Sequence, residues 1–292
     1  MRYEFIFNHP EYPIAKWVKR LKVSRSGYYD WLSRKESVAE KKSVIKEKIK
    51  KLFADSSGTY GPDRICGLLR KEGSKASYRK VAEIMAELGL SSIHNRHKSR
   101  SLTNSKDSRN KNLPNLVKGM NFTLPYQAVC SDISYIPTGE GFLYLCTIKD
   151  IVSGEILGHA TSRSMKKELV IKAFLNAHAR HPLGKHTIFH SDRGSQYTSN
   201  VFIAMLKGLD IKQSFSRVGM PGDNTWAESF FSSFKKEHVH HNYFATRDEA
   251  SFATFSWIEG FYNTTRVQKR LGYVSPSEYR KSFECQEEEL VA

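Results

Sequence analysis

The stretch YQAVCSDISYIPT, residues Tyr126–Thr138, decides the fold of this chain. Apolar residues alternate through it with the period of two that is typical of a buried β-strand, and one acidic residue, Asp132, lies in the middle. An unpaired carboxylate in such a strand costs on the order of several kcal/mol when it loses water. The strand therefore predicts a functional carboxylate at the centre of a sheet.

The segments that follow predict the rest of that sheet. GFLYLCTIKDIV and GEILGHAT are two further strand candidates, and the glycine-containing turns before them favour an antiparallel meander. An amphipathic helix (164–181), a short strand ending at Ser191, a helix (200–207) and a strand (210–216) come next. The helix in DNTWAESFFSSFKKE, residues 223–237, closes the series. This order predicts an α/β, ribonuclease-H-like fold with a mixed five-stranded sheet and flanking helices.

Residues 1–90 have a different pattern, which predicts an all-α region. The segment 15–35 divides into two short amphipathic helices about a KVSRS turn, with Ser24 or Ser26 as the cap of the second. A separate lysine-rich helix is expected over 38–54, and two more helices after it. A helix-turn-helix-like, DNA-binding region fits this pattern, although many small helical bundles share it.

The distribution of charge supports a polyanionic partner. The 292 residues carry a formal net charge of +16. Residues 1–118 hold 27 Lys and Arg against 12 Asp and Glu, whereas 119–292 hold 19 against 18. Residues 91–118, rich in Ser and Asn with seven Lys and Arg, predict a flexible basic linker that binds phosphate, or a plain spacer.

No run of about 18 apolar residues and no signal peptide are recognisable in the sequence, so we expect an intracellular protein without membrane contact. The four cysteines are widely spaced and form no metal-binding pair. We expect reduced, mostly buried thiols.

Two more carboxylates are candidates for chemistry. Asp192 follows the strand that ends at Ser191, where ligand crevices of open α/β sheets form, but an Asp-Arg-Gly turn explains it equally simply. Glu228 closes the T-x-x-E pattern of a capping box with Thr225. Helical geometry nevertheless places Glu228 and Lys235 on the face opposite the aromatic residues, which are Trp226, Phe230, Phe231 and Phe234.

These motifs carry a resemblance. SDISYIP, HSDRGSQYTS, SFSRVGMPGDNTWAESFFSSFKKE and YNTTRVQKRLGYVSPSEY are similar to the transposases of bacterial insertion sequences, whose catalytic core is similar to retroviral integrase. The family has two aspartates and a glutamate with thirty-five residues between the second and third, as residues 193–227 are here. VSRSGYYDWL and YGPDRICGLLRKEG extend the resemblance into the basic N-terminal region.

The resemblance implies a site and a chemistry. Asp132, Asp192 and Glu228 would be the catalytic residues and the ligands of two Mg²⁺ or Mn²⁺ ions, because oxygen-only ligands select hard divalent cations. Residues near the second aspartate and ahead of the catalytic helix would support these ligands: His190, Gln196, Tyr197 and Asn224. The residues expected to contact DNA are Lys235, Lys236, Arg193, Arg25, Arg64, Arg96, Lys98 and Arg100.

The same resemblance implies an organisation and partners. The expected domains are a DNA-binding region (1–90), a linker (91–118), an integrase-type catalytic core (119–245) and a C-terminal helical appendix (246–292). The partners would be the DNA ends and target, further copies of the chain, and the upstream-frame product in a frameshift fusion. The location would be the bacterial cytoplasm, on the nucleoid. A non-enzymatic DNA-binding regulator and a ribonuclease-H-like nuclease without joining activity are the alternatives.

Overall fold

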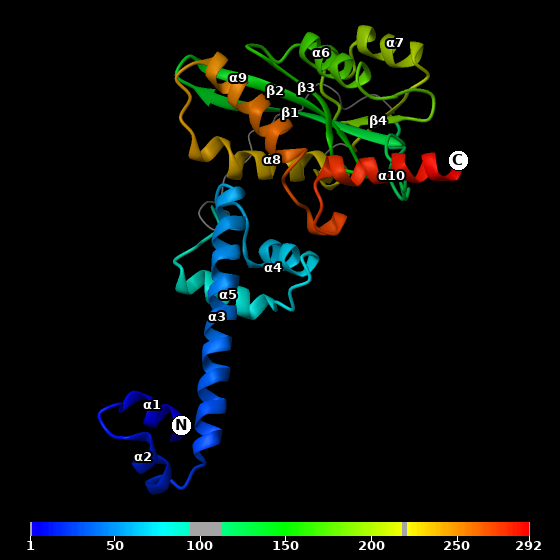
Figure 1. Cartoon of the computed structure of the whole chain (residues 1–292). Coiled ribbons are helices and arrows are strands. Elements are labelled where there is room, and N and C mark those ends of the chain that lie inside the picture. Colours follow the sequence, from blue (N-terminus) through cyan, green and yellow to red (C-terminus); the bar gives the residue numbers. More distant parts are fainter. Residues whose placement is uncertain (1, 94–112, 218–220, 292) are drawn as a thin grey trace. The chain divides into compact units, whose positions relative to one another are not determined.

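The computed structural model describes residues 2–93, 113–217 and 221–291 (Figure 1). The chain divides into two compact units, Met1–Cys66 with Lys75–Leu90, and Gly67–Ser74 with Ser91–Ala292. Most of the predicted basic linker (94–112) lies outside the described residues.

Helices make up the first unit. They are α1 (Arg2–Asn8), α2 (Ile14–Arg20), α3 (Arg25–Asp55), the start of α4 (Pro62–Lys71), and α5 (Tyr78–Glu87). Ser24 is the N-cap of α3, and its hydroxyl accepts from the Gly27 amide at 2.9 Å. The prediction of two helices over 25–54 is wrong, because α3 is continuous over 31 residues. After Gly27 the segment contains no glycine or proline, so nothing in it breaks the helix.

The turn between α2 and α3 contains a residue in a left-handed conformation. Lys22, with φ of 51°, follows the last residues of α2. Because glycine adopts this conformation without a Cβ clash, we expect Lys22→Gly to stabilise the first unit by about 0.5–1 kcal/mol. Hydrogen exchange on the full chain measures this. The matched Lys19→Gly, inside α2, should instead destabilise the unit by about 1 kcal/mol; equal effects of the two substitutions would refute the conformational explanation.

The second unit contains a five-stranded sheet. Its strands are β1 (Ala128–Thr138), β2 (Gly141–Asp150), β3 (Ile156–Ser162), β4 (Ile188–Ser191) and β5 (Lys212–Phe215), in the order β3-β2-β1-β4-β5. β1, β2 and β3 form the predicted antiparallel meander, and β4 and β5 add to β1 in parallel. The mixed sheet and its helices confirm the ribonuclease-H-like fold.

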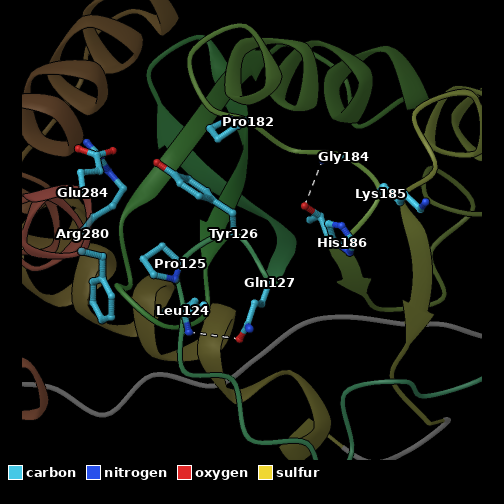
Figure 2. Close-up of a pocket in the computed structure, with 12 residues that line it drawn as sticks. Leu124, Pro125, Tyr126, Gln127, Pro182, Gly184, Lys185, His186, Arg280 and Glu284 are labelled. Atoms are coloured by element: carbon cyan, nitrogen blue, oxygen red, sulfur yellow. Dashed lines mark hydrogen bonds and ion pairs between the residues drawn. The ribbon is translucent and has the colours of Figure 1, made fainter. Parts of the chain in front are cut away.

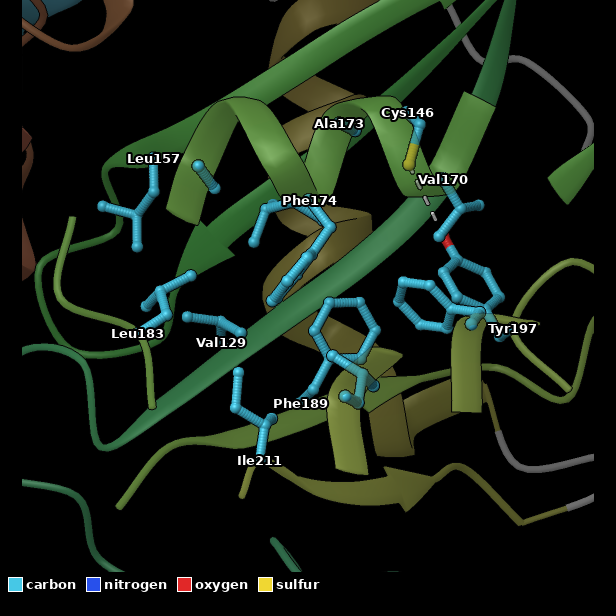
Figure 3. Packing of buried hydrophobic residues seen from close by; sticks show 14 of the residues in the cluster. Val129, Cys146, Leu157, Val170, Ala173, Phe174, Leu183, Phe189, Tyr197 and Ile211 are labelled. Atoms are coloured by element: carbon cyan, nitrogen blue, oxygen red, sulfur yellow. Dashed lines mark hydrogen bonds between the residues drawn. The ribbon is translucent and has the colours of Figure 1, made fainter. Parts of the chain in front are cut away.

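One face of the sheet packs against α6 (Lys167–His178) and α7 (Asn200–Gly208). The apolar face of α6 predicted from the sequence is buried there, and Phe174, Phe189 and Phe202 make edge-to-face contacts at 5.2–6.0 Å (Figure 3 shows this cluster). This apolar cluster fixes β4, and with it the position of the residues that follow β4.

The opposite face packs against α8 (Thr225–Glu237) and the C-terminal helices. A 3₁₀ turn (Pro221–Asn224) precedes α8; the segments after it are Val239–His241, α9 (Arg247–Phe255), a π-helical segment (Ser256–Tyr262), Lys269–Leu271 and α10 (Pro276–Val291). Phe230, Phe231 and Phe234 of α8 are buried against Ile136 and Leu145 of the sheet. The aromatic face of α8 thus anchors this helix, as the sequence predicted.

Two further expectations concern the whole chain. No helix in the described ranges is long and apolar enough to cross a membrane. Cys66, Cys130 and Cys146 are free and buried, as predicted, and the side chain of Cys285 lies outside the described residues.

Candidate active site

Asp132 lies in β1 on the face of the sheet that packs against α8. Its neighbours on that face, Cys130 and Ile136, are buried against apolar residues of the α8 side. The Asp132 carboxylate accepts a hydrogen bond from the Ile133 amide at 2.8 Å. Among the described residues no arginine or lysine forms an ion pair with this carboxylate, so its charge is not offset by a basic side chain in direct contact.

The parallel pairing of β1 with β4 brings Asp192 to the same end of the sheet. Cys130 pairs with His190, so Asp132 and Asp192 are each two residues further along adjacent strands. Asp192 also accepts from the Gly194 amide at 2.9 Å, which is the turn role considered above. Asp192 can stabilise the turn and also bind a ligand, because the hydrogen bond from Gly194 uses only one of its two carboxylate oxygens, Oδ1.

Glu228 lies in the first turn of α8 and is exposed. The helix begins one residue earlier than a Thr225 capping box requires, since Asn224 is the N-cap and makes no side-chain capping bond. Among the described residues Glu228 has no hydrogen-bond or ion-pair partner. The capping-box alternative is thus not realised in this structure, and the carboxylate is available to a ligand.

The electrostatics link these three carboxylates. Burial, and then the charge of Asp192 and that of Glu228, raise the pKa of Asp132 to about 7. Partial burial of the carboxyl groups also raises the pKa of Asp192 and of Glu228, although both residues remain at the surface. Three segments far apart in sequence therefore place like charges near one another, where a cation would relieve their repulsion.

Lys235 belongs to the same neighbourhood. Burial lowers the pKa of its ammonium group, and the charge of Asp132 opposes that shift. Its Nζ lies over the ring of Tyr135, 4.9 Å from the centroid. A cation–π contact therefore holds the Lys235 side chain against β1, at a residue three positions after Asp132. Tyr135 was not predicted as a site residue, because an aromatic residue in a strand gives no sign of function in the sequence. Lys236 is half-buried beside Lys235.

His190 and Asn224 position the segment that leads into α8. His190 is buried; its Nε2 donates to the Asp223 carbonyl at 3.0 Å, and Nδ1 lies 2.9 Å from Ser214 Oγ. Burial lowers the pKa of His190, so the ring is neutral at pH 7. Asn224 is also buried, and its amide donates to the Ser131 carbonyl at 3.3 Å. Both residues therefore connect β4 and β1 to the start of α8.

Tyr197 and Gln196 fix the segment after Asp192. The buried Tyr197 hydroxyl is 2.8 Å from Ser131 Oγ, on the residue preceding Asp132. Gln196 donates to the Met165 carbonyl at 2.8 Å. The two contacts hold the loop that carries Asp192 against β1 and against the start of α6.

The predicted DNA-contact arginines lie in several environments. Arg193 donates to the carbonyls of Ser216 (2.9 Å) and Leu113 (3.2 Å), so its guanidinium supports the loop. In the first unit, Arg25 lies over the Tyr29 ring and Arg64 over the Tyr60 ring. Arg96, Lys98 and Arg100 lie outside the described residues. DNA contact by these arginines and lysines stays a prediction.

An ion pair missed by the sequence interpretation closes the base of the loop before α8. Arg217 donates through its Nε and Nη2 to the Asp223 carboxylate at 2.9 and 3.0 Å, and Asn115 donates to it at 3.1 Å. The Arg217 side chain accordingly holds the pKa of Asp223 well below its usual range. The signal available in the sequence was a basic residue, Arg217, and an acidic residue, Asp223, on either side of a glycine-containing stretch.

No group of three or more His, Cys, Asp or Glu side chains in the described ranges lies close enough to hold a metal ion as placed. The three carboxylates are thus neighbours that do not form a closed ligand set in this structure. Their chemistry, oxygen donors only with raised pKa values, nevertheless fits a hard divalent cation.

A pocket of about 400 Å³ lies elsewhere (Figure 2). Tyr126, Gln127, His186 and Thr187 line it ahead of β1 and β4, so it is at the opposite end of the parallel strands from Asp192. It is separate from the candidate active site.

Comparisons with known proteins identify the family. The model described as Integrase core domain matches residues 123–221, a second model of that description matches 228–283, and an HTH-like domain matches 40–98. The transposase for insertion sequence element IS904 of Lactococcus lactis is 35% identical over 82% of this chain and 94% of that protein. Transposase InsF for insertion sequence IS3A of Escherichia coli is 31% identical over 96% of this chain and 98% of that protein.

Among solved structures, the catalytic core domain of BIV integrase aligns with a TM-score of 0.42 at 16% identity, covering 56% of this chain and 98% of that one. The assignment rests on the sequence relatives, which match over nearly their whole length, and on the two integrase core matches. The chain belongs to the family of insertion-sequence transposases, with an integrase core domain preceded by an HTH-like domain.

Proposed function

We propose that this transposase cleaves and joins DNA strands at the ends of an insertion sequence, with Asp132, Asp192 and Glu228 as the ligands of two Mg²⁺ or Mn²⁺ ions. The observation that carries the proposal is the position of Asp132, a carboxylate on the α8 face of β1, beside the strand that Asp192 follows; burial, and then the charges of Asp192 and Glu228, raise its pKa to about 7. Such crowding of carboxylates on one sheet end destabilises a protein unless a cation offsets it, so it indicates a metal-binding function.

The reaction is phosphoryl transfer. The oxygen of a water (cleavage) or of a DNA 3′-hydroxyl (joining) forms a bond to phosphorus while the bond to the leaving 3′-oxygen breaks, without a covalent enzyme intermediate. The bound ions would supply Lewis-acid activation of the attacking oxygen and stabilisation of the leaving one. The protein supplies the carboxylates and a nearby ammonium group, that of Lys235, about 10.5 Å along α8 from Glu228.

DNA phosphate is the expected partner of that ammonium group. Lys235 is held over Tyr135 and lies within electrostatic range of Asp132, so it can contact a phosphate beside the metals without being a ligand itself. Lys236 lies next to it, and the excess charge of residues 1–118 would bind DNA outside the core. We also propose that the chain acts as a homo-oligomer, because two DNA ends must be paired, and that an upstream-frame product can be fused to it.

A strand-transfer assay tests this function. The full chain is incubated with a labelled duplex that carries the terminal repeat of its own element and with a target plasmid, in Mg²⁺, in Mn²⁺ or in EDTA. We expect cleaved ends and joined products in either metal and neither in EDTA. Cleavage without joining would instead indicate a nuclease, and DNA binding without any cleavage would indicate the non-enzymatic regulator.

A further inference from the structure

Lys149 is a buried basic residue that the proposed reaction does not use. It lies in β2 on the α8 face of the sheet, paired with Cys130 of β1 and only 4% exposed. Within the described part of the chain no carboxylate pairs with its ammonium group. The groups that accept from Nζ are neutral: the Trp226 carbonyl at 2.7 Å and Ser229 Oγ at 3.4 Å.

Both acceptors belong to the first turn of α8, on either side of Glu228. Ser229 Oγ also donates to the Trp226 carbonyl at 2.8 Å, so one ammonium group and one hydroxyl converge on the same oxygen. Asn224, just before this turn, is bonded to Ser131 of β1. The turn that carries Glu228 is therefore hydrogen-bonded to both strands beneath it, whereas Phe230, Phe231 and Phe234 of the later turns meet the sheet by apolar packing, which is not directional.

Stability alone does not explain a lysine at this position. A buried ammonium group with only neutral acceptors loses its hydration, and the N-terminal end of a helix dipole is unfavourable for a positive charge. An unbranched apolar side chain would fill the same space without either penalty. What such a side chain would lack is a directional bond to the backbone of the α8 turn.

We infer that Lys149 is a positioning residue that holds the first turn of α8 at the distance from β1 at which Glu228 faces Asp132 and Asp192. The inference rests on the proposed metal-binding role of those three residues. A role in positioning and an effect of charge alone predict opposite changes in cation binding. If Lys149 acted only through its charge, removing the ammonium group would strengthen the binding of a cation. If it acts by position, removing it weakens that binding.

The experiment measures binding of Mn²⁺ to the full chain by thermal shift, with no DNA present. Lys149→Met removes the ammonium group and keeps the length of the side chain, and Lys212→Met, at an exposed position of β5, is the matched control. We expect Lys149→Met to raise the Mn²⁺ concentration at half-saturation about 10-fold or more, as loss of a supporting residue does in other metal sites. Its melting temperature without metal should equal or exceed that of the wild type. Lys212→Met should change neither quantity.

Several outcomes overturn the inference. The inference is wrong if the Mn²⁺ concentration at half-saturation is the same in Lys149→Met as in the wild type. It is also wrong if that concentration is lower, which would show an effect of charge alone. If Lys149→Met does not fold, Lys149 is needed for the fold and the reasoning from stability is wrong; Lys149→Gln, which keeps an N–H donor, then provides the Mn²⁺ measurement. Glu228→Gln separates the two proposals: if it binds Mn²⁺ like the wild type, the proposed function fails, whatever Lys149 does.

Discussion

Replacing Asp132 by asparagine should abolish metal-dependent strand joining and should also make the metal-free protein more stable. The loss of activity follows from the loss of a charged metal ligand, and we expect it to be at least about 10²- to 10³-fold. Strand transfer into a plasmid target in Mg²⁺ measures it. Asp192→Asn and Glu228→Gln should give losses of the same order, since the three carboxylates act as one ligand set.

The gain in stability follows from the pKa of Asp132. Because the folded-state pKa, about 7, exceeds the ordinary 3.8, the folded state binds the proton more tightly than the unfolded state does. The resulting stabilisation is complete below pH 4 and is lost as the pH rises through 7. Asparagine carries no charge, so above pH 7 the variant should exceed the wild type by up to about 4 kcal/mol, at roughly 1.4 kcal/mol per pKa unit.

Thermal unfolding in EDTA at pH 8 measures this difference, and adding Mn²⁺ should stabilise the wild type alone. The matched control is Asp210→Asn at an exposed position away from the site, which should alter neither joining nor the effect of Mn²⁺. Wild-type joining by Asp132→Asn would contradict the ligand assignment. A lower melting temperature of that variant in EDTA would contradict the electrostatic explanation.

Replacing Arg266 by methionine should destabilise the second unit by about 3–5 kcal/mol. Arg266 and Glu237, at the end of α8, form a pair with two contacts of 2.5 and 2.6 Å, and their side chains are 5% and 0% exposed. Removing the arginine leaves the Glu237 carboxylate charged and buried, and it also removes the contact with the Tyr262 ring. The large effect thus comes from the partner that stays behind.

Urea unfolding followed by tryptophan fluorescence measures this loss, since Trp257 lies in the same apolar cluster. The double variant Arg266→Met with Glu237→Met should recover most of the stability, because the buried carboxylate is removed together with the arginine. Arg180→Met, which breaks the more exposed pair with Glu259, is the control and should cost about 1 kcal/mol or less. If the double variant were as unstable as the single one, packing of Arg266 and not its charge would be responsible.

The sequence was most informative where its pattern is local. Period two gave the meander, and helical periodicity gave the buried face of α6 and the anchored face of α8. The register of β1 with β4 could not be read from those patterns, and this register is what brings Asp132 and Asp192 to one sheet end. Two helices were predicted where α3 is continuous, because the polar stretch between them resembles a loop although it is compatible with helix.

By itself, the sequence determined that the sheet carries a carboxylate in a strand, that two more follow at family spacing, and that the excess positive charge lies in the first 118 residues. Only the tertiary structure decided which groups surround them. Glu228 leaves its capping box because the helix starts at Thr225, and Lys149 lies beneath that first turn because β2 pairs with β1. The reason is physical: the periodicity of a segment fixes the face it buries, whereas hydrogen bonds and charge coupling between distant segments depend on distances that only the assembled fold sets.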